Sequence, residues 1–102
     1  GNHEMIVAAK AGIESMVRSA SKTYARKELR FNAIAPSLTN TPLSKNIVNN
    51  PISLKASEKM HPVGRIGVPK DISNAIKFLI DPKNNWITGQ TLSVDGGMSS
   101  TK

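Results

Sequence analysis

The sequence predicts an α/β fold in which two parallel strands and two main helices form only part of a domain. Apolar residues recur at helical spacing over 2–26 and 69–80, and each of these segments precedes a short apolar strand, at 29–35 and 91–94. Two strands leave both sheet edges and much apolar surface uncovered. The 102 residues are 38% hydrophobic but only 4% aromatic, a thin core for a free-standing domain. We therefore expect 1–102 to be one incomplete domain.

The first predicted helix, 2–26, has apolar residues on two faces. One face follows three- and four-residue steps and the other adds small residues, which permit close approach between helices. A helix with two apolar faces is usually covered on both. The residues concerned are Ile6, Ala9, Ile13, Val17, Ala20 and Tyr24 on one side, and Met5, Ala8, Gly12 and Met16 on the other.

The first predicted strand, 29–35, is short and mostly apolar, as is typical of a parallel strand buried on both faces. Pro36 ends it because proline has no N–H for a ladder. The following segment, 37–68, is polar and broken by prolines and glycines, with short helices expected at 42–49 and 52–60. A connection of this length is usually functional or mobile.

The clearest helix is predicted over 69–80. Pro69 suits the first helical position, and Asp71 places a negative charge in the first turn. Its apolar stripe consists of Ile72, Ala75, Ile76 and Leu79, widened by Phe78. The strand 91–94 follows, and 95–97 (Asp-Gly-Gly) form a turn. The order strand, helix, strand favours a parallel crossover.

Composition excludes several classes of function. The net charge of +7 arises from 14 Lys and Arg residues against 7 Asp and Glu, but these are scattered, so we expect no nucleic-acid partner. The absence of cysteine excludes thiolate metal sites and suits a reducing cytoplasm, where we expect the protein. No apolar run is long enough for a membrane span, and no residues have metal-ligand spacing. Because the first residue is Gly1, we expect a processed chain or a fragment.

Four segments, in order, resemble the C-terminal half of the short-chain dehydrogenase/reductase family. They are Ala8-Ala9-Lys10-Ala11-Gly12-Ile13, Phe31-Asn32-Ala33-Ile34-Ala35-Pro36, the run 62–72 (PVGRIGVPKDI) and the run 86–97 (WITGQTLSVDGG). The resemblance covers essentially the whole chain. It implies a Rossmann-like parallel sheet and an enzyme that uses NAD or NADP to interconvert alcohols and carbonyls.

The resemblance also implies which catalytic parts are absent. The family's glycine-rich phosphate loop and catalytic serine have no counterpart in this sequence, and Ile6 stands where the family has its tyrosine, four residues before Lys10. In the family that tyrosine exchanges the substrate proton, and the lysine lowers its pKa and holds the nicotinamide ribose. Lys10 is thus the catalytic and ribose-binding candidate, expected to contact solvent in this chain alone. His3 shares its helix face and is a candidate substitute acid, against the alternative of a histidine with no role.

The turn after Pro36 resembles the family's nicotinamide-contacting turn, with Ser37 in place of the usual glycine. The resemblance places Pro36 and Ser37 among the cofactor-binding residues. It assigns the carboxamide contacts to Leu38 and Thr39, and a carboxamide or pyrophosphate contact to Thr41. A generic turn, with Thr41 capping a helix before Pro42, is the alternative. Further along, we expect structural roles for His61 and Arg65.

The function implied is therefore part of an NAD(P)-dependent alcohol/carbonyl oxidoreductase, inactive alone and with no cofactor expected for this chain by itself. The alternative is a non-catalytic oligomerisation module or a degenerate relative that lost the tyrosine, since the first helix and the last helix and strand are surfaces that the family uses for assembly. The expected partners are further copies of this chain or a missing N-terminal half. Neither the substrate nor the choice between NAD and NADP can be read from these residues.

Overall fold

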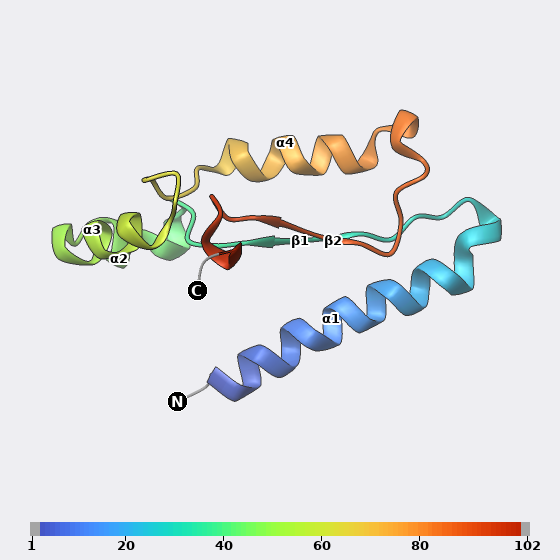
Figure 1. Cartoon of the computed structure of the whole chain (residues 1–102), viewed down its shortest axis with the longest axis horizontal. Helices are drawn as coiled ribbons and strands as arrows, with labels where there is room; N and C mark the ends of the chain where they lie inside the picture. The colour runs from blue at the N-terminus through green and yellow to red at the C-terminus, as the bar shows by residue number, and fades with distance from the viewer. Residues whose placement is uncertain (1–2, 101–102) are drawn as a thin grey trace. The chain divides into compact units, whose positions relative to one another are not determined.

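The structure is a computed structural model, and it describes residues 3–100 (Figure 1). The main elements are α1 (His3–Tyr24), β1 (Ala33–Pro36), α2 (Lys45–Val48), α3 (Pro51–Met60), α4 (Pro69–Ile80) and β2 (Thr91–Val94). Short 3-10 helices occur at Ala25–Lys27, Pro42–Ser44, Pro82–Asn84 and Met98–Ser100. The helices predicted at 42–49 and 52–60 are present, with the first divided between a 3-10 turn and α2.

The strands β1 and β2 are neighbours in one sheet and run in the same direction (Figure 1). At their leading ends the N–H of Gly89 donates to the carbonyl of Phe31, at 2.7 Å, and the N–H of Ala33 donates to that of Gln90, at 2.9 Å. From the first hydrogen bond to the second, the residue number rises in both segments, as in a parallel pair. The predicted α/β class with a parallel pair of strands is confirmed.

The chain divides into two compact units. The first consists of Gly1–Ala33 and Leu79–Leu92, and the second of Ile34–Phe78 and Ser93–Lys102, so the division crosses both strands and the last turn of α4. Each unit has its own hydrogen bonds and its own candidate site, and each is described separately below.

In the first unit, an extended segment after α1 is fastened to the loop before β2. The N–H of Phe31 donates to Thr88 Oγ1 at 3.1 Å, and the Asn32 amide donates to the Ile87 carbonyl at 3.0 Å and accepts from the Gln90 N–H at 3.1 Å. The rings of Tyr24 and Phe31 lie 5.7 Å apart, which supports the expected packing role of Tyr24. Because side chains take these hydrogen bonds, β1 begins at Ala33, and the prediction of a strand from 29 was wrong by four residues.

The second unit is organised by a parallel bridge between Thr39 and Gly67. Asn50 caps α3 by accepting from the N–H groups of Ile52 and Ser53, at 3.0 and 3.1 Å, an arrangement that typically contributes about 1 kcal/mol. The helix α4 starts at Pro69 and ends at Ile80, as predicted. Its start is fixed by Asp71, whose carboxylate accepts from the N–H of Val68 at 2.8 Å.

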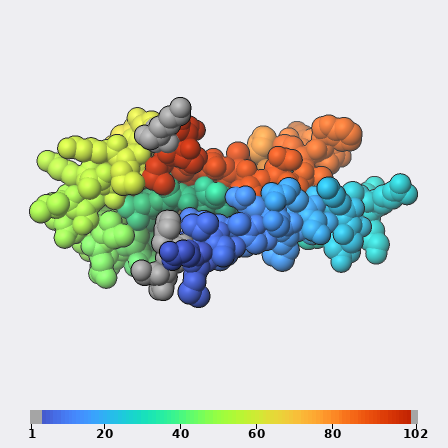
Figure 2. Space-filling view, turned by 60° about the horizontal axis from the view of Figure 1, so that its bottom comes forward, coloured from blue at the N-terminus to red at the C-terminus, as the bar shows by residue number. Residues whose placement is uncertain are grey.

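Apolar burial is sparse in the described residues. Among the hydrophobic side chains of residues 3–100, only Ile66 and Leu79 are buried, each 8% exposed. Leu79 is the one member of the predicted α4 stripe that is so well covered. The side chains of α1 lie on the surface in Figure 2, where this helix is blue. The exposed apolar residues of that helix are Met5, Ile6, Val7, Ile13, Met16 and Tyr24. Within 3–100, no helix is long and apolar enough to cross a bilayer.

Candidate functional site

The turn that follows β1 holds five of the predicted cofactor-contacting residues, Pro36, Ser37, Leu38, Thr39 and Thr41. Its backbone is fixed on one side by Gly67, whose N–H donates to the Leu38 carbonyl and whose carbonyl accepts from the Asn40 N–H, at 2.9 and 2.8 Å. A Cβ on Gly67 would lie 3.1 Å from Thr39 Oγ1, closer than most Cβ contacts, so a side chain there would press on the turn. The structure therefore brings these five residues together on one fixed turn.

Ser44 fastens the far end of the same turn. Its hydroxyl donates to the Thr39 carbonyl and accepts from the Thr41 N–H at 3.0 Å. Thr41 occupies the N-cap position of the 3-10 helix Pro42–Ser44, as the generic alternative had it. By contrast, the N–H groups of Leu38 and Thr39 donate to nothing within residues 3–100. These two half-buried backbone donors are what the turn offers to a ligand.

Ser37 does not point its hydroxyl into free space. Its Oγ lies 2.7 Å from Nε2 of His61 and 3.4 Å from the carbonyl oxygen of Asp95. His61 is only 4% exposed, and its other ring nitrogen, Nδ1, lies 2.6 Å from the carbonyl oxygen of Ser57. A hydrogen-bonded line therefore runs from α3 through His61 and Ser37 to the turn after β2.

The turn after β2 supplies the far end of this line. The Asp95 carboxylate accepts from the N–H groups of Ser99 and Gly97, at 3.1 and 3.0 Å. Hydrogen bonding by Ser99 and Gly97 lowers the pKa of Asp95 below its ordinary value. Gly96 has a φ of +61° and passes so close to Val63 that a Cβ would lie 2.7 Å from its side chain. The predicted Asp-Gly-Gly turn is confirmed, and it closes one wall of a cavity.

That cavity has a volume of about 160 Å3. Its lining joins residues from every loop of the second unit: Ser37, His61, Val63, Arg65, Gly67, Asp71, Val94, Asp95 and Gly96. Most of these residues are far apart in the sequence. The Ser37 and His61 pairing, which was not predicted from the sequence, thus lies at the edge of a partly open cavity.

Arg65 and Asp71 form the ion pair on this wall. Their side chains meet through two hydrogen bonds, of 2.8 and 3.2 Å, and the guanidinium also donates to the Ile66 carbonyl at 3.0 Å. The Arg65 hydrogen bonds, with that from Val68, lower the pKa of Asp71 from 3.8 to about 2. This bidentate contact ties the loop 61–68 to the first turn of α4, which supports the structural role expected for Arg65.

The remaining predicted catalytic residues lie on α1, in the first unit. Lys10 is exposed, as expected for this chain alone, and Ile6 is 51% exposed one helical turn before it. His3 is the first residue of α1, and its side chain lies outside the described residues. Within residues 3–100, no group of histidines and carboxylates is placed to hold a metal ion.

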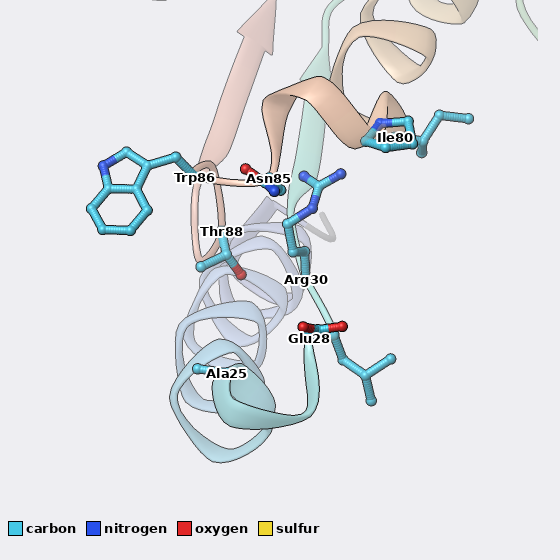
Figure 3. Close-up of a pocket in the computed structure, with 9 residues that line it drawn as sticks. Ala25, Glu28, Arg30, Ile80, Asn85, Trp86 and Thr88 are labelled. Atoms are coloured by element: carbon cyan, nitrogen blue, oxygen red, sulfur yellow. The ribbon is translucent and has the colours of Figure 1, made fainter.

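The first unit also contains an open pocket of about 700 Å3 between the end of α1 and the loop before β2 (Figure 3). Arg30 crosses it and donates to the carbonyls of Ile87 and Asp81, at 3.1 and 3.3 Å. The indole of Trp86 points away from the other lining residues in Figure 3 and is 96% exposed. Ile80 and Leu29, also on this rim, are 67% and 49% exposed.

These features can be compared with known proteins. A family model described as enoyl-(acyl carrier protein) reductase matches residues 1–99. The chain belongs to the short-chain dehydrogenase/reductase family. The resemblance inferred from the four sequence segments is thereby confirmed.

Curated members of the short-chain dehydrogenase/reductase family share over a third of the aligned residues. The chain is 37% identical over 92 residues to 3beta-hydroxysteroid dehydrogenase 1 of Eggerthella lenta, covering 90% of this chain and 35% of that protein. It is 43% identical over 93 residues to the 3-oxoacyl-[acyl-carrier-protein] reductase of Chlamydia trachomatis, covering 90% and 36%. The chain thus spans about a third of the length of these relatives, which agrees with the prediction of a partial domain.

Solved structures of the family show the same arrangement of elements. A 4-hydroxyisoleucine dehydrogenase complexed with NADH superposes with a TM-score of 0.90 at 25% identity, covering 94% of this chain and 40% of that one. The protein ElxO with NADP bound superposes with a TM-score of 0.83 at 29% identity, covering 92% and 38%. Complete members of the short-chain dehydrogenase/reductase family therefore bind either nicotinamide dinucleotide.

Proposed function

We propose that this chain forms the C-terminal part of an NAD(P)-dependent oxidoreductase for small alcohol or carbonyl substrates, and that it transfers no hydride by itself. The observation that carries the proposal is the fixed turn 36–41 with its two unused backbone donors. A carboxamide has one carbonyl acceptor and one NH2 group, so adjacent N–H groups held in place suit its oxygen. The geometry fits the nicotinamide end of the cofactor.

Different residues of the turn would contact the nicotinamide carboxamide and keep the backbone rigid. Leu38 and Thr39 provide N–H donors on a backbone that Gly67 and Ser44 keep rigid. Ser37, which replaces the glycine of the family pattern, turns its hydroxyl toward His61 rather than toward these donors. The side chain at this position is therefore compatible with an approach to the N–H groups of the turn, and Thr41 remains available at the edge.

When bound, the nicotinamide ring supplies or accepts the hydride. The chain's own contribution would be to orient that ring through the turn and to hold its ribose through Lys10, whose ammonium is free to reach a ligand. Ile6 has no ionisable proton and cannot exchange one with a substrate. His3 remains the candidate for a substitute acid, because histidine titrates near neutral pH.

A non-catalytic assembly module is the second candidate, and the exposed apolar faces favour it. On α1 the side chains of Met5, Ile6 and Met16 are 72%, 51% and 64% exposed. Surface of this kind is usually covered by a partner. Under both proposals the partner is either another copy of this chain or a separate N-terminal half that completes the sheet. We further expect the assembled protein in the cytoplasm, which cell fractionation tests.

Titration with NADH and NADPH tests the proposed function. Fluorescence should show no saturable binding to the purified chain after its intact mass is verified, and saturable binding once a family N-terminal half carrying the phosphate loop is supplied. Lys10→Met should weaken that binding, and Lys55→Met, on the exposed side of α3, serves as the matched control. Saturable binding by the chain alone would contradict the expectation that it binds no cofactor by itself. No binding by the completed protein would favour the assembly module.

A further inference from the structure

Ser37 lies on the proposed cofactor-binding turn, but its hydroxyl is directed toward His61, where the pair has the geometry of an activated hydroxyl. Nδ1 of His61 lies 2.6 Å from the Ser57 carbonyl oxygen, and a carbonyl can only accept a hydrogen bond. Nδ1 must therefore carry the proton. In the neutral ring, Nε2 is then left with a lone pair. Ser37 Oγ lies 2.7 Å from it and is the one donor that reaches this atom within residues 3–100. The proton of the serine hydroxyl is directed at a base.

The competing acceptor for this hydroxyl is weaker. The Asp95 carbonyl oxygen lies 3.4 Å from Ser37 Oγ, at the long limit of a hydrogen bond, whereas the contact to His61 has the usual length. His61 is 4% exposed, so bulk solvent has little access to its ring. A nucleophile next to a base that a third group orients is the arrangement needed for attack on an acyl carbon. Here the third group is the carbonyl of Ser57.

The adjoining cavity sets the size of what can be attacked. Its volume is about 160 Å3, and at ~30 Å3 for each water-sized group it accommodates about five such groups. Val63 and Val94 provide apolar lining, and Arg65 is already paired with Asp71. These dimensions suit the acyl part of a short ester.

We propose that Ser37 is a nucleophilic serine, activated by His61, that accepts a short acyl group from an activated ester. The Ser37 oxygen forms a bond to the acyl carbon while its proton passes to Nε2 of His61. The bond from that carbon to the ester's leaving oxygen breaks, and the leaving alcohol takes the proton from His61. Water, deprotonated by the same nitrogen, then releases the acid and restores the serine.

Because a neutral carbonyl, that of Ser57, orients His61, we expect slow turnover of the ester. A buried carboxylate in this position stabilises the imidazolium that forms during transfer, and its replacement by a neutral group in a serine protease costs about 10⁴ in rate. The Ser57 carbonyl orients the ring but carries no full charge. Both steps should therefore be slow. An ester whose leaving group departs without protonation, such as a p-nitrophenyl ester, should acylate Ser37 faster than water releases the acid, so one equivalent of alcohol is released before slow hydrolysis.

The test uses p-nitrophenyl acetate and the full 102-residue chain. We expect one burst of p-nitrophenolate, with the acetyl group mapped to Ser37 by peptide mass spectrometry and removed by hydroxylamine, unlike any acetyl group on lysine. Ser37→Ala should abolish this ester. Ser73→Ala, an exposed serine on α4, should retain it, and His61→Gln should slow its formation by about 10²-fold. Circular dichroism of each variant verifies the fold.

A second measurement does not depend on the acyl donor. The sequence has no cysteine, so Ser37→Cys introduces a single thiol beside His61. Its alkylation by iodoacetamide should be at least about tenfold faster than in the Ser37→Cys/His61→Gln double variant, with Ser73→Cys showing no such dependence on His61. An unlabelled Ser37 or equal alkylation rates would overturn the proposal. Neither result bears on dinucleotide binding, so the two proposals fail separately.

Discussion

A Cβ atom placed on Gly89 would lie 2.6 Å from the hydroxyl oxygen of Ser21 and 3.3 Å from its Cβ. Gly89 has a φ of +74°, and its N–H donates to the Phe31 carbonyl at 2.7 Å. Ser21 is 8% exposed and donates its own hydroxyl to the Arg18 carbonyl. The loop before β2 thus approaches α1 more closely than any residue with a side chain allows.

The first prediction concerns this contact. Gly89→Ala adds both a steric clash and a left-handed backbone conformation that alanine disfavours, and it should lower the free energy of unfolding by roughly 1–3 kcal/mol. Gly12→Ala on α1 is the matched control, because a Cβ there meets nothing within 4 Å. In that helix alanine should raise stability by up to ~1 kcal/mol. Urea denaturation of both variants tests the predicted loss of stability for Gly89→Ala and the predicted gain for Gly12→Ala. Equal effects would contradict the contact between Gly89 and Ser21.

The second prediction concerns the side chain that replaces ladder hydrogen bonds before β1. Asn32→Asp keeps the shape and the acceptor for the Gln90 N–H, but it turns a carboxylate oxygen toward the Ile87 carbonyl. Losing that donor should cost about 1–3 kcal/mol in the free energy of unfolding. Asn74→Asp, on the exposed face of α4, should change it little. Chemical denaturation compares the pair, and no difference between them would contradict the role of Asn32.

The third prediction concerns acid stability. The pKa of Asp71 is about 2 in the folded chain against an ordinary value of 3.8. Because folding lowers this pKa, the ionised carboxylate contributes stability above about pH 4, and that contribution is lost as the pH falls toward about 2. Asp71→Asn should flatten the fall of the urea midpoint across this window. Glu14→Gln, an exposed carboxylate on α1, is the control and should leave the slope unchanged.

The fourth prediction concerns the rim of the first unit's pocket. Trp86 is the one tryptophan and is 96% exposed, so its emission reports directly on whether this rim is covered. If copies of the chain associate through it, emission should shift to the blue with rising concentration. Trp86→Ala should then weaken association by about 2 kcal/mol, roughly thirtyfold in Kd. Leu43→Lys, at a residue 98% exposed in the second unit, should not. Light scattering measures the association.

Helix bounds were predictable from the sequence where local chemistry determines them. Pro69 and Asp71 both lie in the first turn of α4, and the helix has the predicted limits. The strand β2 was likewise found at 91–94. The start of β1 was not predictable in this way. The hydrogen bonds that determine it join residues 31 and 32 to a loop more than fifty residues away.

The candidate site was predictable only in part. The turn 36–41 was identified through its likeness to a family motif, since its residues are contiguous. The pairing of Ser37 with His61 spans 24 residues and requires the Thr39–Gly67 bridge and the end of α3 to be in place. Sequence spacing carries no sign of such a contact. The one signal in the sequence was a serine at a turn position where the family pattern has glycine.

Sparse apolar burial should affect the steady-state amount of this protein in a cell. Chaperones and proteases act on chains that display apolar segments, and modest changes in stability alter steady-state abundance several-fold. The side chains that α1 and the Trp86 rim display would engage this machinery until a partner covers them. If a partner covers these side chains, as proposed, the amount of the protein should follow the supply of that partner more closely than the rate of its own synthesis.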